Sequence, residues 1–113
     1  MSDFMYLFRG GMNQSSPEEM QKNMQKWMGW MKELTAKGHF KAGEPLEAGG
    51  RTLKGKNKIV TDGPYTESKD LVGGYLVVSA GSLEQATELA KGCPIFEYDG
   101  LVEVRPVMLM QQP

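Results

Sequence analysis

Apolar and polar positions along the chain follow two different periods, and together they predict a mixed α and β domain. Residues 3–9 (DFMYLFR) and 73–80 (GGYLVVSA) are apolar at successive positions, which predicts strands that are buried on both faces. Residues 39–46 and 101–107 are typical of shorter strands. The segment 51–62 has extended residues on each side of a glycine-containing turn, which predicts a β-hairpin.

Two further segments carry a helical period, and each begins at a serine. Ser16, Pro17 and Glu19 form a capping box with proline in the first turn, and Gly38 ends the segment. We expect the apolar stripe of this helix to face the core. It comprises Met20, Met24, Trp27, Met28, Met31 and Leu34, with Trp30 at its edge.

The second helix is predicted from Ser82, with Gln85 at the capping-box position, to Gly92. The element order is therefore β-α-β, hairpin, β-α-β. It predicts an α+β fold, the ferredoxin-like split βαβ unit with an added β-hairpin, in which two helices cover one face of a four-stranded antiparallel sheet. A chain of 113 residues is one domain, residues 1–113.

Two helices leave one face of the predicted sheet uncovered, although strands 3–9 and 73–80 are apolar on both sides. An apolar patch of this size is too large to remain exposed on a stable monomer. The simplest cover is a second copy related by a two-fold axis. We therefore expect a homodimer whose two sheets form a barrel-like core, a dimeric α+β barrel.

Charge and composition narrow the class of protein. The net charge is −1 and the pI is about 5.8, so the chain has no basic excess to bind nucleic acid. No apolar run is long enough to span a membrane, and the first residues do not resemble a signal peptide. Cys93 is the single cysteine, which excludes an intramolecular disulfide and fits a reducing compartment. We expect a cytoplasmic protein.

The sequence indicates neither a metal site nor a cofactor. His39 is the only histidine, and no HxxxH or CxxC spacing occurs. His39 can serve as an acid or base, but a partly exposed residue at a strand start is the favoured interpretation. Cys93 has no base beside it in sequence, so we expect a small, partly buried side chain. The methionines can bind copper(I), but core packing is favoured.

Glu44 is a candidate acid or base. By alternation it shares a strand face with three apolar residues, Phe40, Ala42 and Leu46. A buried carboxylate is costly unless it is paired, and such residues are site candidates. The alternative is that Pro45 or a bulge shifts the register and exposes Glu44 to solvent.

Arg105 shares a face of the last strand with Leu101 and Glu103. Its guanidinium can pair with a carboxylate of the sheet, either Glu44 or Asp62, or with the acid group of a ligand. A structural ion pair is the favoured interpretation, and an anion-binding role is the alternative.

The stretch VTDGPYTESKD, residues 60–70, contains both turn and site signals. Asp62 opens an Asp-Gly-Pro turn, which explains the first half of the stretch without any function. The turn does not require the polar residues that follow. Tyr65, Glu67 and Lys69 are therefore candidate ligand-binding residues, and Asp62 is a candidate acid or base.

Residues 60–78 (VTDGPYTESKDLVGGYLVV) and 102–107 (VEVRPV) closely resemble the DGPF-domain proteins of the YCII-related family. Residues 16–20 (SPEEM) and 42–46 (AGEPL) fit the same pattern, so the resemblance covers residues 4–107. It implies a dimeric α+β barrel. It implies no particular reaction, because most members have none established. Some members are encoded near extracytoplasmic-function sigma factors, which implies a regulatory association.

One branch of that family carries a histidine in an Arg-Pro-x-His motif at the start of the first helix. This chain has Ser16, Pro17, Glu18 and Glu19 at the matching positions, so Glu19 replaces the histidine. The departure argues against a histidine-dependent mechanism here.

The leading hypothesis is a small-molecule-binding dimer of unestablished activity, a candidate for a cofactor-free acid/base enzyme. Its cleft would lie between the helices or loops and the sheet, with Asp62 and Glu44 as acid and base. Lys69 and Arg105 would orient an anionic or carbonyl-bearing ligand, and Tyr65 would line the wall of its pocket. The rival is a non-catalytic binding or regulatory dimer associated with sigma-factor systems. A metal or haem protein is a third, less favoured alternative.

Overall fold

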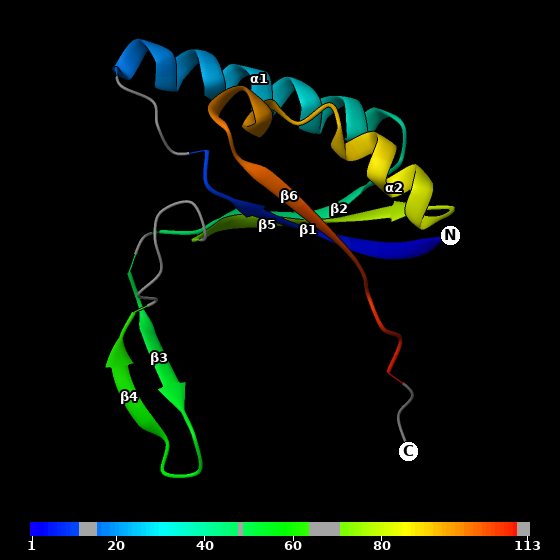
Figure 1. The fold of residues 1–113 in the computed structure, drawn as a ribbon. Coiled ribbons are helices and arrows are strands. Elements are labelled where there is room, and N and C mark those ends of the chain that lie inside the picture. Colours follow the sequence, from blue (N-terminus) through cyan, green and yellow to red (C-terminus); the bar gives the residue numbers. More distant parts are fainter. Residues whose placement is uncertain (12–15, 48, 64–70, 111–113) are drawn as a thin grey trace.

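The computed structural model describes residues 1–11, 16–47, 49–63 and 71–110, which form two helices, a short 3-10 helix and six strands (Figure 1). In chain order they are β1 Ser2–Arg9, α1 Pro17–Ala36, β2 Phe40–Pro45, β3 Arg51–Lys54, β4 Ile59–Asp62, β5 Val72–Ala80, α2 Leu83–Ala90, η2 Pro94–Tyr98 and β6 Leu101–Pro106.

Four of the strands form one antiparallel sheet in the order β2-β5-β1-β6. Both helices lie on the same side of this sheet (Figure 1). The order and the antiparallel pairing are those of the ferredoxin-like split βαβ unit, which confirms the predicted fold class. Within the described part of the chain, strands β3 and β4 pair only with each other, as the added hairpin between β2 and β5. The sheet of one chain is open and does not close into a barrel.

Both helices begin where the serine caps predict. The Ser16 hydroxyl accepts a hydrogen bond from the Glu19 amide, and the Ser82 hydroxyl accepts one from the Gln85 amide, each at 3.1 Å. At the second helix the Gln85 side chain also accepts from the Gly81 amide at 2.6 Å, which completes a reciprocal cap around Ser82.

The core lies between the helices and the sheet, and aromatic side chains fill much of it. Phe4, Tyr6 and Phe8 of β1 are buried on this face, below Trp30 and Leu34 of α1. The Tyr6 hydroxyl donates to the carbonyl of Ala86 at 2.5 Å, and the Trp30 ring nitrogen donates to the carbonyl of Leu89 at 3.1 Å. The polar atoms of both rings are therefore satisfied inside the core.

The methionine stripe predicted to face the core is only partly buried. Met20, Met24 and Met28 are exposed at 54%, 63% and 61% of their surface. Side chains four residues apart are rotated by about 40° around an α-helix, so this row turns away from the sheet. The inward face is centred instead on Trp27, Trp30, Met31 and Leu34.

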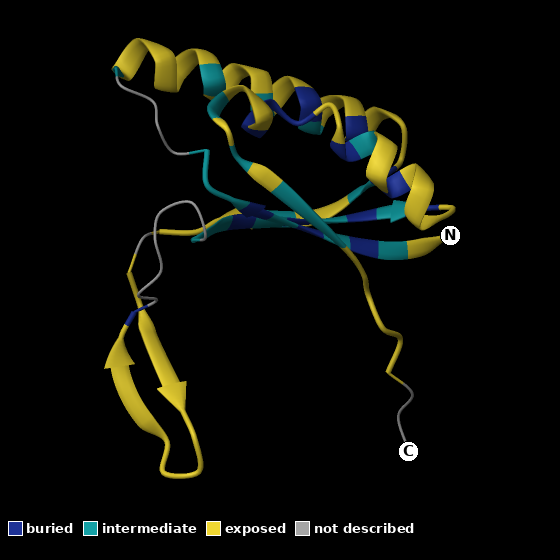
Figure 2. Cartoon of the chain, viewed as in Figure 1, coloured by how far each residue is buried: buried dark blue, intermediate teal, exposed yellow. Residues whose placement is uncertain are grey.

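The other face of the sheet, which we call the open face, has no helix over it (Figure 2). It carries the side chains that alternate with the core residues, among them Met5 and Leu7 of β1 and Tyr75 and Val77 of β5, all half-buried. The predicted burial on both sides is therefore complete on only one side within a single chain.

The β3–β4 hairpin and residues 107–110 project on the side of the open face (Figure 1). All eight strand residues of the hairpin are exposed. No helix among the described residues is long and apolar enough to cross a membrane.

Candidate functional site

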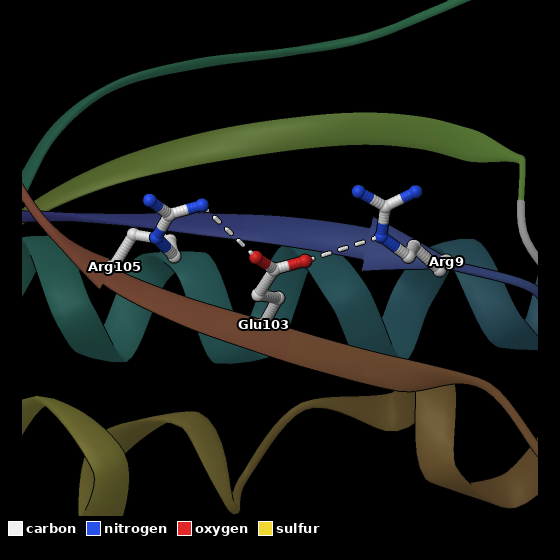
Figure 3. A network of polar contacts seen from close by, with 3 residues as sticks. All are labelled: Arg9, Glu103 and Arg105. Carbon is white, nitrogen blue, oxygen red and sulfur yellow. Dashed lines mark hydrogen bonds and ion pairs between the residues drawn. The ribbon is translucent and has the colours of Figure 1, made fainter.

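Three charged side chains of the open face form a connected cluster at the β1–β6 edge (Figure 3). The Glu103 carboxylate lies between two guanidinium groups. Its Oε1 is 3.3 Å from Arg9 Nε and its Oε2 is 3.2 Å from Arg105 Nη1. The register explains the contact, because Glu103 pairs with Leu7 while Arg9 pairs with Leu101. We call Arg9, Glu103 and Arg105 the arginine cluster.

Both guanidinium groups of the arginine cluster carry a positive charge, since neither loses its proton in a protein. Arg9 and Glu103 are about one-third exposed, so solvent screens them only partly, whereas 66% of the Arg105 side chain is exposed. A planar guanidinium that faces an open surface beside apolar side chains can bind a carboxylate or another planar anion.

Only part of this cluster was visible in the sequence. Arg105 was singled out, and alternation placed Glu103 on its face. Arg9 was missed, although it alternates with Leu7 and Met5 in the first strand. The sequence alone does not reveal the register between β1 and β6, which brings Arg9 close to Glu103.

Glu44 also lies on the open face, but it is exposed rather than buried. A register irregularity between Phe40 and Ala42 separates the residues that alternation placed together. Phe40 pairs with Val78 on the core side, whereas Glu44 pairs with Tyr75 on the open side. The shifted register is the alternative that the sequence left open.

Glu44 and the arginine cluster belong to one row across the sheet. Through successive strand pairs, Glu44 neighbours Tyr75, Tyr75 neighbours Leu7, and Leu7 neighbours Glu103. Three strand spacings place the two carboxyl-bearing residues about 14 Å apart. They share a surface, with an aromatic and an aliphatic side chain between them, but they do not contact each other directly.

Asp62 lies away from this row, at the end of β4. Its Oδ1 is 3.3 Å from Nη1 of Arg51, its partner across the hairpin, and both side chains are largely exposed. The next residue, Gly63, donates its amide to the Gly50 carbonyl at 3.2 Å, which closes the base of the hairpin. Arg105 therefore pairs with Glu103 of its own strand, and not with Asp62 or Glu44 as considered from the sequence.

The predicted ligand-binding residues Tyr65, Glu67 and Lys69 lie outside the residues that the structure describes.

His39 and Cys93 lie in the core layer, away from the open face. His39 is buried rather than partly exposed, and its Nδ1 lies 2.7 Å from the carbonyl oxygen of Ser79. Because a carbonyl only accepts, Nδ1 carries the hydrogen. Burial raises the pKa of the Cys93 thiol to about 12. The thiol is therefore neutral at physiological pH and is not a nucleophile.

A cavity of about 480 Å³ lies on the helix side, between α1 and η2. Its lining includes Trp30, Cys93 and Phe96, and the ion pair of Lys26 with Glu97, at 2.6 Å, borders it. Neither Glu44, Asp62 nor Arg105 lines this cavity. Among the described residues, no group of three or more His, Cys, Asp and Glu side chains is arranged to hold a metal ion.

Comparison with known proteins identifies the family. No curated protein matches the chain. Among solved structures, the chain is similar to 5-chloro-2-hydroxyhydroquinone dehydrochlorinase (TftG) from Burkholderia phenoliruptrix AC1100, in complex with 2,5-dihydroxybenzoquinone. The identity is 20% over 91% of each chain, with a TM-score of 0.46. The model of the YCII-related domain matches residues 4–111, and the chain therefore belongs to the YCII-related family.

Proposed function

We propose that the protein is a homodimer that binds a small anionic molecule on the open face of its sheet. The observation that carries this proposal is the arginine cluster, a half-buried carboxylate held between two guanidinium groups on a surface that no helix covers. A structural ion pair needs one cation for one anion. Arg105 adds a second guanidinium, 66% exposed, beside the ion pair of Arg9 with Glu103 on a largely apolar face.

The ligand class follows from this chemistry. The positive charge favours a carboxylate, an enolate or a phenolate, because a guanidinium binds planar oxygen anions with two parallel hydrogen bonds. Leu7 and Tyr75 lie between the cluster and Glu44, so the same surface offers apolar and aromatic contact to the body of a small ligand.

Homodimerisation supplies the enclosure that one chain lacks. Met5, Leu7 and Val77 form an apolar centre of the open face, and a second copy placed on it would exclude water from the arginine cluster. Exclusion of water strengthens the attraction between the cluster and an anion.

Any acid/base turnover would use Glu44, which lies on the open face. Asp62, which lies at the end of β4 in the hairpin, is the second proposed acid or base. We retain Tyr65, Glu67 and Lys69 as proposed ligand-binding residues. We also propose a cytoplasmic location, because the free cysteine Cys93 suits a reducing compartment. The comparisons name no sigma factor, and we do not propose a regulatory association.

A thermal-shift screen of small carboxylates and phenolates tests the proposed function. A ligand that binds only the folded state raises the melting temperature with its concentration. We expect hits whose shift is lost in Arg105→Gln. The control is Lys91→Gln, which removes an equally exposed cation that is paired with Glu88 on the helix side.

Hits that raise the melting temperature of the wild-type protein and of Arg105→Gln equally would contradict the placement of the site. Turnover of a bound hit, followed by its absorbance, would separate an enzyme from a binding protein. An unchanged rate in Glu44→Gln would then remove Glu44 from the mechanism.

A further inference from the structure

The β3–β4 hairpin is an exposed arm with an apolar surface. We call Arg51–Asp62 the arm. Leu53, Ile59 and Val60 are exposed at 63%, 60% and 54%. Among the residues that the structure describes, strands β3 and β4 pair with no other strand, and an isolated two-stranded hairpin is marginally stable in water. An extended arm of this kind therefore needs a surface to lie against.

The two faces of the arm differ in their chemistry. Leu53 pairs with Val60, so their side chains point to one face and form a continuous apolar pair. The other face carries Ile59 opposite Lys54. Alternation places the Arg51–Asp62 ion pair on the same face as Leu53 and Val60. The Leu53–Val60 face is thus the better apolar contact surface.

The charge of the arm is opposite to that of the rest of the chain. Residues 51–62 contain four basic and one acidic side chain, a net charge of +3. The whole chain contains 13 basic and 14 acidic residues, so the remainder has nine and 13, a net charge of −4. Copies of this chain are therefore complementary to each other, with the arm of one attracted to the body of another.

The direction and length of the arm fit a second copy on the open face. The arm projects to that side of the sheet (Figure 1). From Arg51 to Lys54 the strand spans about 13 Å, at about 3.3 Å per residue, and the turn lies beyond it. Two sheets packed face to face are about 10 Å apart. The arm is therefore long enough for its turn to reach the sheet of a second copy.

We infer that the arm clasps a second copy of this chain. The Leu53–Val60 face of the arm lies against that copy, and the lysines at the tip of the arm lie beside its acidic body. The lysines are Lys54, Lys56 and Lys58. This inference rests on the homodimer of the proposed function and adds the element that locks it.

Paired substitutions test the apolar contact. Leu53→Thr combined with Val60→Thr places threonine, a residue that favours strands, at both positions and removes the apolar face. Ile59→Thr removes one apolar side chain of similar exposure from the opposite face and is the control. We expect the double variant to raise the dimer dissociation constant by about tenfold or more, and Ile59→Thr to change it by about twofold or less.

Zero-length carbodiimide crosslinking tests the charge contact in the unaltered protein. Equal amounts of ¹⁴N-labelled and ¹⁵N-labelled chains are unfolded together, refolded and crosslinked. We expect peptides that join residues 54–58 of one isotope to a carboxylate of the other isotope. Crosslinks from the arm lysines that are confined to one isotope would overturn the inference.

The outcomes separate the arm from the dimer. A dimeric wild-type protein whose dissociation constant is unaffected by Leu53→Thr with Val60→Thr would overturn the arm and leave the homodimer intact. A wild-type chain that stays monomeric would overturn both. Tight binding of a fluorescent DNA duplex that the Lys56→Glu variant loses would overturn the arm as well, because the basic turn would then serve another partner.

Discussion

The two faces of one four-stranded sheet differ in how far a single chain completes them (Figure 2). On the core side, Tyr6 and Val78 are fully buried and Tyr6 finds a hydrogen-bond partner in α2. On the open side, the alternating residues Leu7 and Val77 are only half-buried and have no layer above them. The same strands therefore have one face that is buried within the chain and one face that is only partly buried.

The difference separates stability from function. On the core side, the polar atoms of the Tyr6 and Trp30 rings are hydrogen-bonded to backbone carbonyls, which serves folding. The open side contains the arginine cluster and Glu44 among apolar side chains, a combination that folding of one chain does not require. We interpret the core side as what holds the subunit together and the open side as what the subunit uses to associate and bind.

The largest expected effect on the core side is from Trp30→Ala. Trp30 is buried and stacks at 6.0 Å from the Tyr6 ring centroid, so its removal leaves a cavity. We expect a loss of about 3–5 kcal/mol in the free energy of unfolding, measured by urea denaturation. Met24→Ala on the exposed side of the same helix is the control, with a loss of about 0.5 kcal/mol or less. Similar losses in the two variants would contradict the placement of the core.

Leu7→Asp breaks the open side. It introduces a second carboxylate directly opposite Glu103, which already holds both guanidinium groups, and a buried charge without a partner of its own costs about 3–5 kcal/mol. We expect the dimer dissociation constant to rise by more than about a hundredfold while the circular dichroism spectrum of the subunit is retained. Leu83→Asp on the outside of α2 is the control and should leave association unchanged. Dimers of Leu7→Asp as tight as wild type would place the contact elsewhere.

Alkaline pH should weaken the core side alone. Burial raises the pKa of Cys93 from 9.0 to about 12, and burial together with the nearby Cys93 raises that of Tyr6 from 10.0 to about 12. The unfolded chain therefore releases these protons at lower pH than the folded chain. The stability that these groups contribute is present below pH 9 and is lost as the pH rises toward 12.

Urea denaturation across that pH range measures this loss, and Cys93→Ala should flatten the decline. The same slope in Cys93→Ala and wild type would show that the thiol does not contribute to it. Association through the open face should not follow this titration, since neither Cys93 nor Tyr6 lies on it.

The smallest expected effect is from Glu103→Gln. The carboxylate is one-third exposed, so its ion pairs contribute about 0.5–1 kcal/mol to the free energy of unfolding. A double-mutant cycle with Arg105→Gln isolates the coupling between the two side chains. A coupling near zero, or one that is unchanged by salt, would contradict the electrostatic description of the cluster.

The sequence predicted local features well, because caps and alternation depend on neighbours in the chain. Ser16, Ser82 and the apolar runs of β1 and β5 gave the helix starts, the strands and the fold class. It predicted less where packing decides. Two tryptophans centre α1 on a different face, and the irregularity after Phe40 turns Glu44 outward.

The candidate site was predicted in part for the same reason. Arg105 was identified from its own strand, but its link to Arg9 runs through Glu103 and depends on strand pairing across the whole chain. The pairing of Asp62 with Arg51 likewise follows from the register of the hairpin. Contacts between distant segments require the assembled sheet.

Sedimentation equilibrium of the wild-type chain from about 1 to 100 µM tests the central claim most directly, because an open apolar face of this size should draw in a second copy. The account predicts a mass of twice the 12.6 kDa chain across this range. A mass of 12.6 kDa at every concentration would contradict it and would mean that the open face is stable in water.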